Sequence, residues 1–116
     1  MTKKRAERLT GYSIRETPAV RGRVRFAAFD GIEFVAEATG EIEWLALQSL
    51  VHMVLNIHAR KALDKTGWVC ARCKRRRRLQ IHHRKYRSHG GTHRVENLEP
   101  VCWDCHRLIH AKEKSL

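Results

Sequence analysis

Two Cys-x-x-Cys pairs limit the fold of this chain more than any other feature. One motif consists of Cys70 and Cys73, the other of Cys102 and Cys105, and twenty-eight residues separate the two. Each pair brings two thiolates to one side of a tight turn, and two such pairs complete the tetrahedral shell of Zn²⁺. Because four sulfurs leave no position for a substrate, we expect a structural zinc ion that stabilises a small domain. Two neighbouring redox dithiols are the alternative interpretation.

Composition indicates a polyanionic partner. The 116 residues include 24 Lys and Arg against 12 Asp and Glu, which gives a formal net charge of +12. Basic side chains neutralise phosphates and release condensed counterions, so nucleic acid is the expected partner. The basic start is not followed by an apolar signal segment, and no apolar run approaches membrane-spanning length. We therefore expect no membrane partner and a reducing cytoplasm, in which paired cysteines bind metal.

The chain divides into three predicted segments. Residues 1–20 are basic and polar, and we expect them to form a flexible arm. Residues 21–66 are expected to form an extension of a β-hairpin and a helix that contains no catalytic motif. A scaffold, a dimer surface and a DNA-contacting surface are the roles left open for this extension. Residues 67–116 carry the predicted metal sites.

Local patterns define the elements of the extension. Alternating apolar runs flank Asp30-Gly31, a pair that favours a type I′ hairpin turn. Apolar residues then recur at three- and four-residue spacing from Trp44 to about Asp64, which predicts an amphipathic helix. Gly67 is expected to end or follow this helix.

Four histidines near the cysteine pairs predict a second metal centre. His106 and His110 lie one turn apart if residues 102–112 are helical, and at that spacing two imidazoles can share one ion. His82 and His83 lie in a short apolar run, and in a strand their rings would point to opposite sides. Only one ring of the doublet would then join the ion directly, while the other faces elsewhere. A metal ligand beside a proton acceptor suits a hydrolase.

Other interpretations of the histidines remain open at this point. His82 or His110 could replace a cysteine in zinc binding or face solvent. The remaining histidines have no partner at ligand spacing and are expected to be ordinary helix or loop residues; they are His52, His58, His89 and His93.

The region from about Trp68 to Lys112 resembles the HNH endonucleases of the zinc-finger-bearing type. The motifs that carry the resemblance are His82-His83, Gly90-Gly91, Asn97-Leu98, both cysteine pairs, His106 and His110. The terminal His-x-x-x-His is also similar to that of colicin-type DNases. Arg84-Lys85-Tyr86 stands where many members have Ile and then Pro. The resemblance implies an α+β chain with a ββα-metal core, in which the doublet lies on the first strand and the last histidines lie on the helix.

The same resemblance implies a metal-dependent DNA endonuclease. His82, His106 and His110 would hold a divalent ion at the scissile phosphate, and His83 would act as the general base. Asn97 would contact the metal or fasten the loop, and the products would carry 5′ phosphate and 3′ hydroxyl ends. Ligand softness favours Zn²⁺, Ni²⁺, Co²⁺ or Mn²⁺, whereas the family commonly uses Mg²⁺ or Mn²⁺. Analogy with similar chains suggests a bacterial cell or a phage-infected one.

Basic residues on both sides of the doublet are expected to position the DNA backbone. They are Arg75, Arg76, Arg77, Arg78, Arg84, Lys85 and Arg87. A solvated charged surface is the alternative for the four-arginine run. For the whole protein, the alternatives are a non-catalytic zinc-ribbon DNA-binding protein, which leaves the histidines unexplained, and a nuclease that acts on RNA. Cleavage of both strands would require a homodimer or two encounters with DNA.

Overall fold

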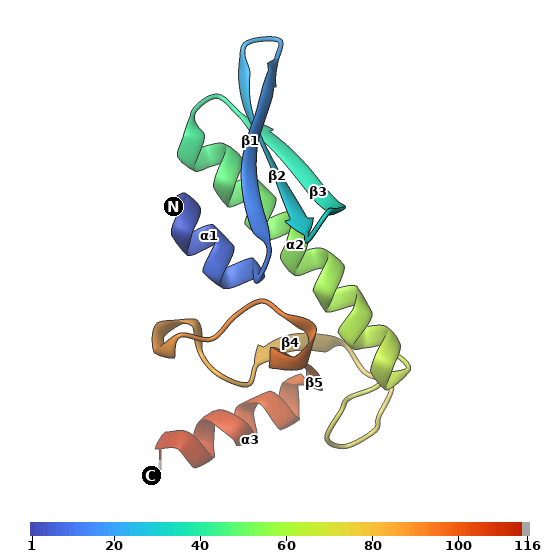
Figure 1. Cartoon of the computed structure of the whole chain (residues 1–116). Coiled ribbons are helices and arrows are strands. Elements are labelled where there is room, and N and C mark those ends of the chain that lie inside the picture. Colours follow the sequence, from blue (N-terminus) through green and yellow to red (C-terminus); the bar gives the residue numbers. More distant parts are fainter. Residues whose placement is uncertain (115–116) are drawn as a thin grey trace.

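A computed structural model describes residues 1–114 of the chain (Figure 1). An N-terminal part made of a helix, a three-stranded sheet and a long helix is followed by a small part with two strands and a helix. The elements are α1 (Lys3–Thr10), β1 (Ser13–Val20), β2 (Arg23–Asp30), β3 (Glu33–Gly40), α2 (Glu43–Thr66), β4 (Leu79–His83), β5 (Leu98–Cys102) and α3 (Trp103–Lys114), with 3₁₀ turns at η1 (Arg87–His89) and η2 (Val95–Asn97). The predicted α+β class is confirmed.

The first twenty residues are helical and extended, so the expectation of a flexible arm is wrong. The Thr2 hydroxyl caps α1 by accepting a hydrogen bond of 3.2 Å from the backbone N–H of Arg5. Gly11 ends the helix in the left-handed conformation, with φ at +75°, where glycine is unstrained. Ala6 and Leu9 are buried in the main core. These few apolar side chains suffice because the sheet and α2 provide the surface that covers them.

The predicted hairpin is formed by β2 and β3, and β1 adds a third antiparallel strand beside β2. Its turn is displaced by one residue from the prediction, since Asp30 pairs with Glu33 and leaves Gly31 and Ile32 as the loop. A register shift between Ala28 and Phe29 lies just before this turn. Gly31 has φ of +64°, whereas Ile32 does not have a positive φ. This pattern belongs to a type II′ turn, so the type I′ expectation is wrong.

Helix α2 joins the two parts of the molecule (Figure 1). Its first half packs on the sheet, where Leu47, Leu50 and Val54 are fully buried against Phe26. Its second half contacts β5 and η2. Gly67 ends the helix with φ of +72°, as predicted from the sequence. None of the helices in residues 1–114 has both the length and the apolar composition needed to cross a membrane.

The C-terminal part has a very small apolar core. Cys70, Val101 and Cys102 are buried, and Leu79 and Ile109 pack partly buried beside them. Strands β4 and β5 pair antiparallel, with His82 opposite Glu99 and His83 opposite Leu98. So little apolar burial stabilises a domain poorly on its own, which makes a metal cross-link the expected supplement.

Candidate active site and metal centres

The four cysteine sulfurs form one compact group. Cys70 and Cys73 precede β4, Cys102 ends β5 and Cys105 lies in the first turn of α3. All four Sγ atoms lie within 4.8 Å of one another, and those of Cys73 and Cys102 are 3.7 Å apart. Zn–S bonds of about 2.3 Å in a tetrahedron require sulfurs about 3.8 Å apart. The group therefore fits a zinc ion.

Backbone donors favour the thiolate form at the centre of this group. The N–H groups of Cys73 and Cys102 each donate to Cys70 Sγ at 3.4 Å. Burial opposes ionisation, but these hydrogen bonds outweigh it and lower the pKa of Cys70 to about 6. Burial and the neighbouring sulfurs raise the pKa of Cys105 to about 12. A cation among the sulfurs would relieve this repulsion, so the chemistry of the group also suits a metal ion.

Three histidines form a second group of ligand atoms, separate from the sulfurs. His82 lies on β4, and His106 and His110 lie one turn apart on α3. One ring nitrogen of each lies within 4.8 Å of the other two, and the Nε2 atoms of His106 and His110 are 3.1 Å apart. Nitrogens that share a tetrahedral ion at about 2.1 Å are about 3.4 Å apart. Small side-chain movements would bring all three to one ion, and neither His82 nor His110 replaces a cysteine.

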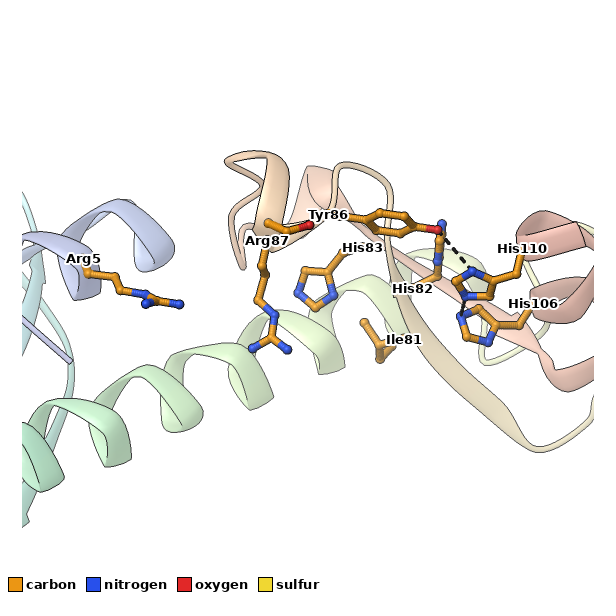
Figure 2. Close-up of a pocket in the computed structure, with 9 residues that line it drawn as sticks. Arg5, Ile81, His82, His83, Tyr86, Arg87, His106 and His110 are labelled. Atoms are coloured by element: carbon orange, nitrogen blue, oxygen red, sulfur yellow. Dashed lines mark hydrogen bonds between the residues drawn. The ribbon is translucent and has the colours of Figure 1, made fainter. Parts of the chain in front are cut away.

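A cavity of about 580 Å³ opens beside this group. Figure 2 shows that α1, β4, the loop after β4 and α3 all contribute to its wall. The Tyr86 hydroxyl lies 3.3 Å from Nδ1 of His110 and so restrains that ring. The charged and aromatic side chains of the lining are Arg5, His82, His83, Tyr86, Arg87, His106 and His110.

His83 lines the same cavity but takes no part in the three-histidine group. The alternation of side chains along β4 explains this separation, because neighbouring residues of a strand point to opposite faces. Nε2 of His83 lies 2.9 Å from Nδ1 of His93. Burial lowers the pKa of His83, and the charges of Arg87 and His82 lower it further. His83 is therefore a neutral imidazole at pH 7 and can accept a proton.

Comparison with known proteins finds a family match for the C-terminal part of the chain. Residues 70–112 match the sequence model of the HNH endonucleases, from the first zinc-group cysteine into α3. We refer to this matched C-terminal segment as the HNH domain. No curated protein and no solved structure matches the chain significantly. Strands β4 and β5 followed by α3, with the three histidines between them, agree with the ββα-metal core implied by the sequence resemblance.

Asn97 of the HNH domain is held by hydrogen bonds to the loop after β4. Its Oδ1 accepts from the backbone N–H of Lys85 at 2.8 Å, and its Nδ2 donates to the carbonyl of Lys85 at 3.0 Å. Nδ2 also donates to the carbonyl of Thr92 at 2.7 Å. The side chain thus ties the segment after the histidine doublet to the segment before β5. Of the two roles that the resemblance left open for Asn97, these contacts favour fastening the loop.

The predicted basic residues divide into two sets around the HNH domain. Arg87 lines the cavity, whereas the four arginines of residues 75–78 are exposed next to the zinc group. Arg77 forms an ion pair of 2.6 Å with Asp104, and Arg84 forms one of 3.3 Å with the buried Glu99. These two guanidinium groups are partly neutralised, so the remaining basic residues carry more of the free positive charge.

Sequence reasoning missed Arg5 of the cavity wall and the contacts of two buried histidines. Arg5 reaches its wall from α1 (Figure 2). His58 and His93, expected to be ordinary residues, are both buried at 2 % exposure, and His93 contacts His83 directly. The pairing of residues as distant as His58 and His93 depends on tertiary packing, and no local spacing signals it.

Proposed function

We propose that this protein is a metal-dependent DNA endonuclease that hydrolyses phosphodiester bonds and leaves 5′ phosphate and 3′ hydroxyl ends. The main support is the cavity in which a neutral imidazole, His83, lies beside a separate group of three histidines suited to a divalent ion. A non-catalytic zinc-ribbon DNA-binding protein would account for the cysteines alone. It would give no role to the second group, so it is the weaker candidate.

The two groups of ligand atoms would hold different ions. Four thiolates suit a structural Zn²⁺, and they remain reduced in the cytoplasm, where we place the protein. His82, His106 and His110 suit Zn²⁺, Ni²⁺, Co²⁺ or Mn²⁺, with Mg²⁺ as a harder alternative. When bound, this second ion would supply positive charge to the scissile phosphate and the leaving 3′ oxygen.

His83 would act as the general base. It would take a proton from a water molecule, whose oxygen then forms a bond to phosphorus as the bond from phosphorus to the 3′ oxygen breaks. This direction of attack leaves the phosphate on the 5′ end. Removal of such a base typically lowers the rate about 10²- to 10⁴-fold. Asn97 would support this step indirectly, because it fastens the loop that follows His83.

DNA would bind through its phosphates. Arg5 and Arg87 line the cavity and would contact the backbone next to the scissile bond. Residues 75–78, with Arg84 and Lys85, would contact the backbone farther away, with Arg77 and Arg84 weakened by their carboxylate partners. Base-specific contacts are not part of this proposal, because guanidinium groups on phosphates position a duplex without reading its sequence.

A plasmid-nicking assay tests the proposal. Zinc-loaded protein is incubated with supercoiled DNA and Mg²⁺, Mn²⁺, Co²⁺, Ni²⁺ or Zn²⁺, and the nicked product is then sealed with DNA ligase, which requires 5′ phosphate and 3′ hydroxyl ends. We expect His83→Ala to lower the rate about 10²- to 10⁴-fold. His52→Ala, which changes an exposed histidine of α2, is the matched control and should keep the wild-type rate.

Three results would count against the proposal. Absence of nicking with every ion would refute the nuclease activity. An unchanged rate for a folded His83→Ala variant would refute the role of His83 as the general base. If single-stranded RNA inhibits nicking more strongly than duplex DNA does, and is itself cleaved, the substrate would be RNA and not DNA. Accumulation of linear plasmid without a nicked intermediate would indicate paired cuts by a homodimer.

A further inference from the structure

The loop before β5 docks on the N-terminal part of the molecule through hydrogen bonds. The backbone N–H of His93 donates to the carbonyl of Leu9 at 2.7 Å, a carbonyl in the last turn of α1 that has no partner within the helix. Arg94 donates to the carbonyl of Gly11 at 3.1 Å, and its guanidinium lies 5.5 Å from the centre of the Tyr12 ring. The docked loop is therefore fixed by α1 and by the residues that follow it.

A second set of contacts reaches the same loop from α2. Nδ1 of His58 lies 2.7 Å from the carbonyl oxygen of His93, and Nε2 of His58 lies 2.8 Å from the Tyr12 hydroxyl. A carbonyl oxygen only accepts hydrogen bonds, so the proton of neutral His58 is on Nδ1. Nε2 of His58 must then accept from Tyr12. The Tyr12 hydroxyl thus donates to His58, and His58 donates to the backbone carbonyl of His93.

The side chain of His93 continues this connection to His83. The His93 ring is buried, and its Nδ1 lies 2.9 Å from Nε2 of His83, with ring centres 5.1 Å apart. Burial, followed by the charge of His83, lowers the pKa of His93 to about 4. His93 is thus neutral at pH 7 and can offer an unprotonated nitrogen to its neighbour.

We propose that His93 is the positioning residue of His83, and that Tyr12 and His58 hold His93 in place. In this arrangement Nε2–H of His83 donates to Nδ1 of His93, which leaves Nδ1 of His83 to take the proton of water. In the reverse arrangement, Nδ1–H of His93 would donate to Nε2 of His83, and the proton of His83 would be on Nδ1. Nε2, the only basic nitrogen of His83, would then be occupied by this hydrogen bond. The proposed bond also survives catalysis, because imidazolium His83 still donates through Nε2 and does so more strongly.

This inference rests on the proposed role of His83 as the base, and it gives the N-terminal extension a function. Residues 1–66 would be a scaffold that completes the active site, since the Tyr12 and His58 side chains and the Leu9 carbonyl all lie in that segment. The other two roles considered for the extension, a dimer surface and a DNA-contacting surface, are not needed to explain these contacts.

Replacement of His93 tests the proposal in the zinc-loaded full chain. Asparagine can present its amide oxygen near the position of Nδ1, whereas alanine cannot accept a hydrogen bond. We expect His93→Ala to lower kcat for plasmid nicking about 10- to 100-fold, by analogy with the loss of a hydrogen-bond partner of a metal-binding histidine, with KM little changed. His93→Asn should restore most of the loss, and Tyr12→Phe should lower kcat by a smaller factor.

Nitrogen NMR of the His83 ring supplies a readout that does not depend on activity. The signals are assigned by their loss in His83→Asn, and the wild type should show neutral His83 with its proton on Nε2. In His93→Ala this preference should weaken, while in His93→Asn it should persist. The proposal is overturned if wild-type His83 carries its proton on Nδ1, or if folded His93→Ala keeps both the wild-type tautomer and the wild-type kcat. A wild-type protein that never nicks DNA but shows the expected tautomers would refute the nuclease function and leave the hydrogen-bonded arrangement standing.

Discussion

Acid should destabilise this protein through His93. Burial lowers its pKa from 6.5 to about 4, with smaller contributions from His83, Arg87, His52 and His58. The unfolded chain, in which the pKa is near 6.5, therefore takes up a proton at a higher pH than the folded chain does. Stability contributed by neutral His93 is fully present above pH 6.5, and it is lost progressively as the pH falls toward 4.

The size of the effect follows from this difference in pKa. One pKa unit corresponds to about 1.4 kcal/mol, so the full shift is worth about 3 kcal/mol below pH 4. At pH 5.5 the unfolded state is mostly protonated and the folded state is mostly neutral, which gives a loss of about 1.4 kcal/mol. The pKa of His58 is also lowered by burial, so the total loss should exceed that from His93 alone.

Urea unfolding of zinc-loaded wild type and His93→Asn at pH 7.5 and pH 5.5 measures this contribution. The variant cannot titrate at position 93. Its loss of unfolding free energy between the two pH values should therefore be about 1.4 kcal/mol smaller than the loss of the wild type. Loss of zinc at the lower pH affects both proteins and cancels in the comparison. Equal losses in the two proteins would show that His93 is not kept neutral by burial, and the reasoning would fail.

Two further predictions concern the HNH domain. A Cβ atom on Gly91 would overlap the Lys85 carbonyl oxygen, so Gly91→Ala should cost about 3 kcal/mol of unfolding free energy in urea. Gly22→Ala, where φ is +75° but nothing lies within 4 Å, should cost only about 1 kcal/mol, and equal costs would contradict the argument. The purified protein should retain one zinc ion per chain after dialysis, and Cys102→Ser should lose it and melt at a lower temperature. Wild type that holds no metal, or a variant that melts with the wild type, would argue against a structural zinc ion.

Short-range patterns in the sequence predicted the ligand groups and the long helix. Cys70 and Cys73 share one turn, and His106 and His110 share one helix face, so spacing alone indicates that each pair can meet. The same holds for α2, whose apolar spacing and terminal Gly67 are both local. The structure brings His82 to the His106 and His110 pair, as the family resemblance implied.

Contacts that depend on packing between distant segments could not be predicted in this way. His93 meets His83, Leu9 and His58, and none of these pairings has a local signature. Helix α1 is hard to predict for a related reason, because its basic, polar segment contains few apolar side chains. Two residues in the sequence do signal α1: Thr2, whose hydroxyl caps its start, and Gly11, which ends it in the left-handed conformation.

The continuous course of α2 has a consequence for anyone who wishes to transplant this domain. Residues 67–116 look like a self-contained cassette in the sequence, with every expected ligand inside it. Cutting the chain at Gly67 would nevertheless remove the Leu9 carbonyl and the His58 ring, and the backbone of His93 would lose both of its anchors. A functional graft of this domain therefore has to carry the preceding sheet and helices with it.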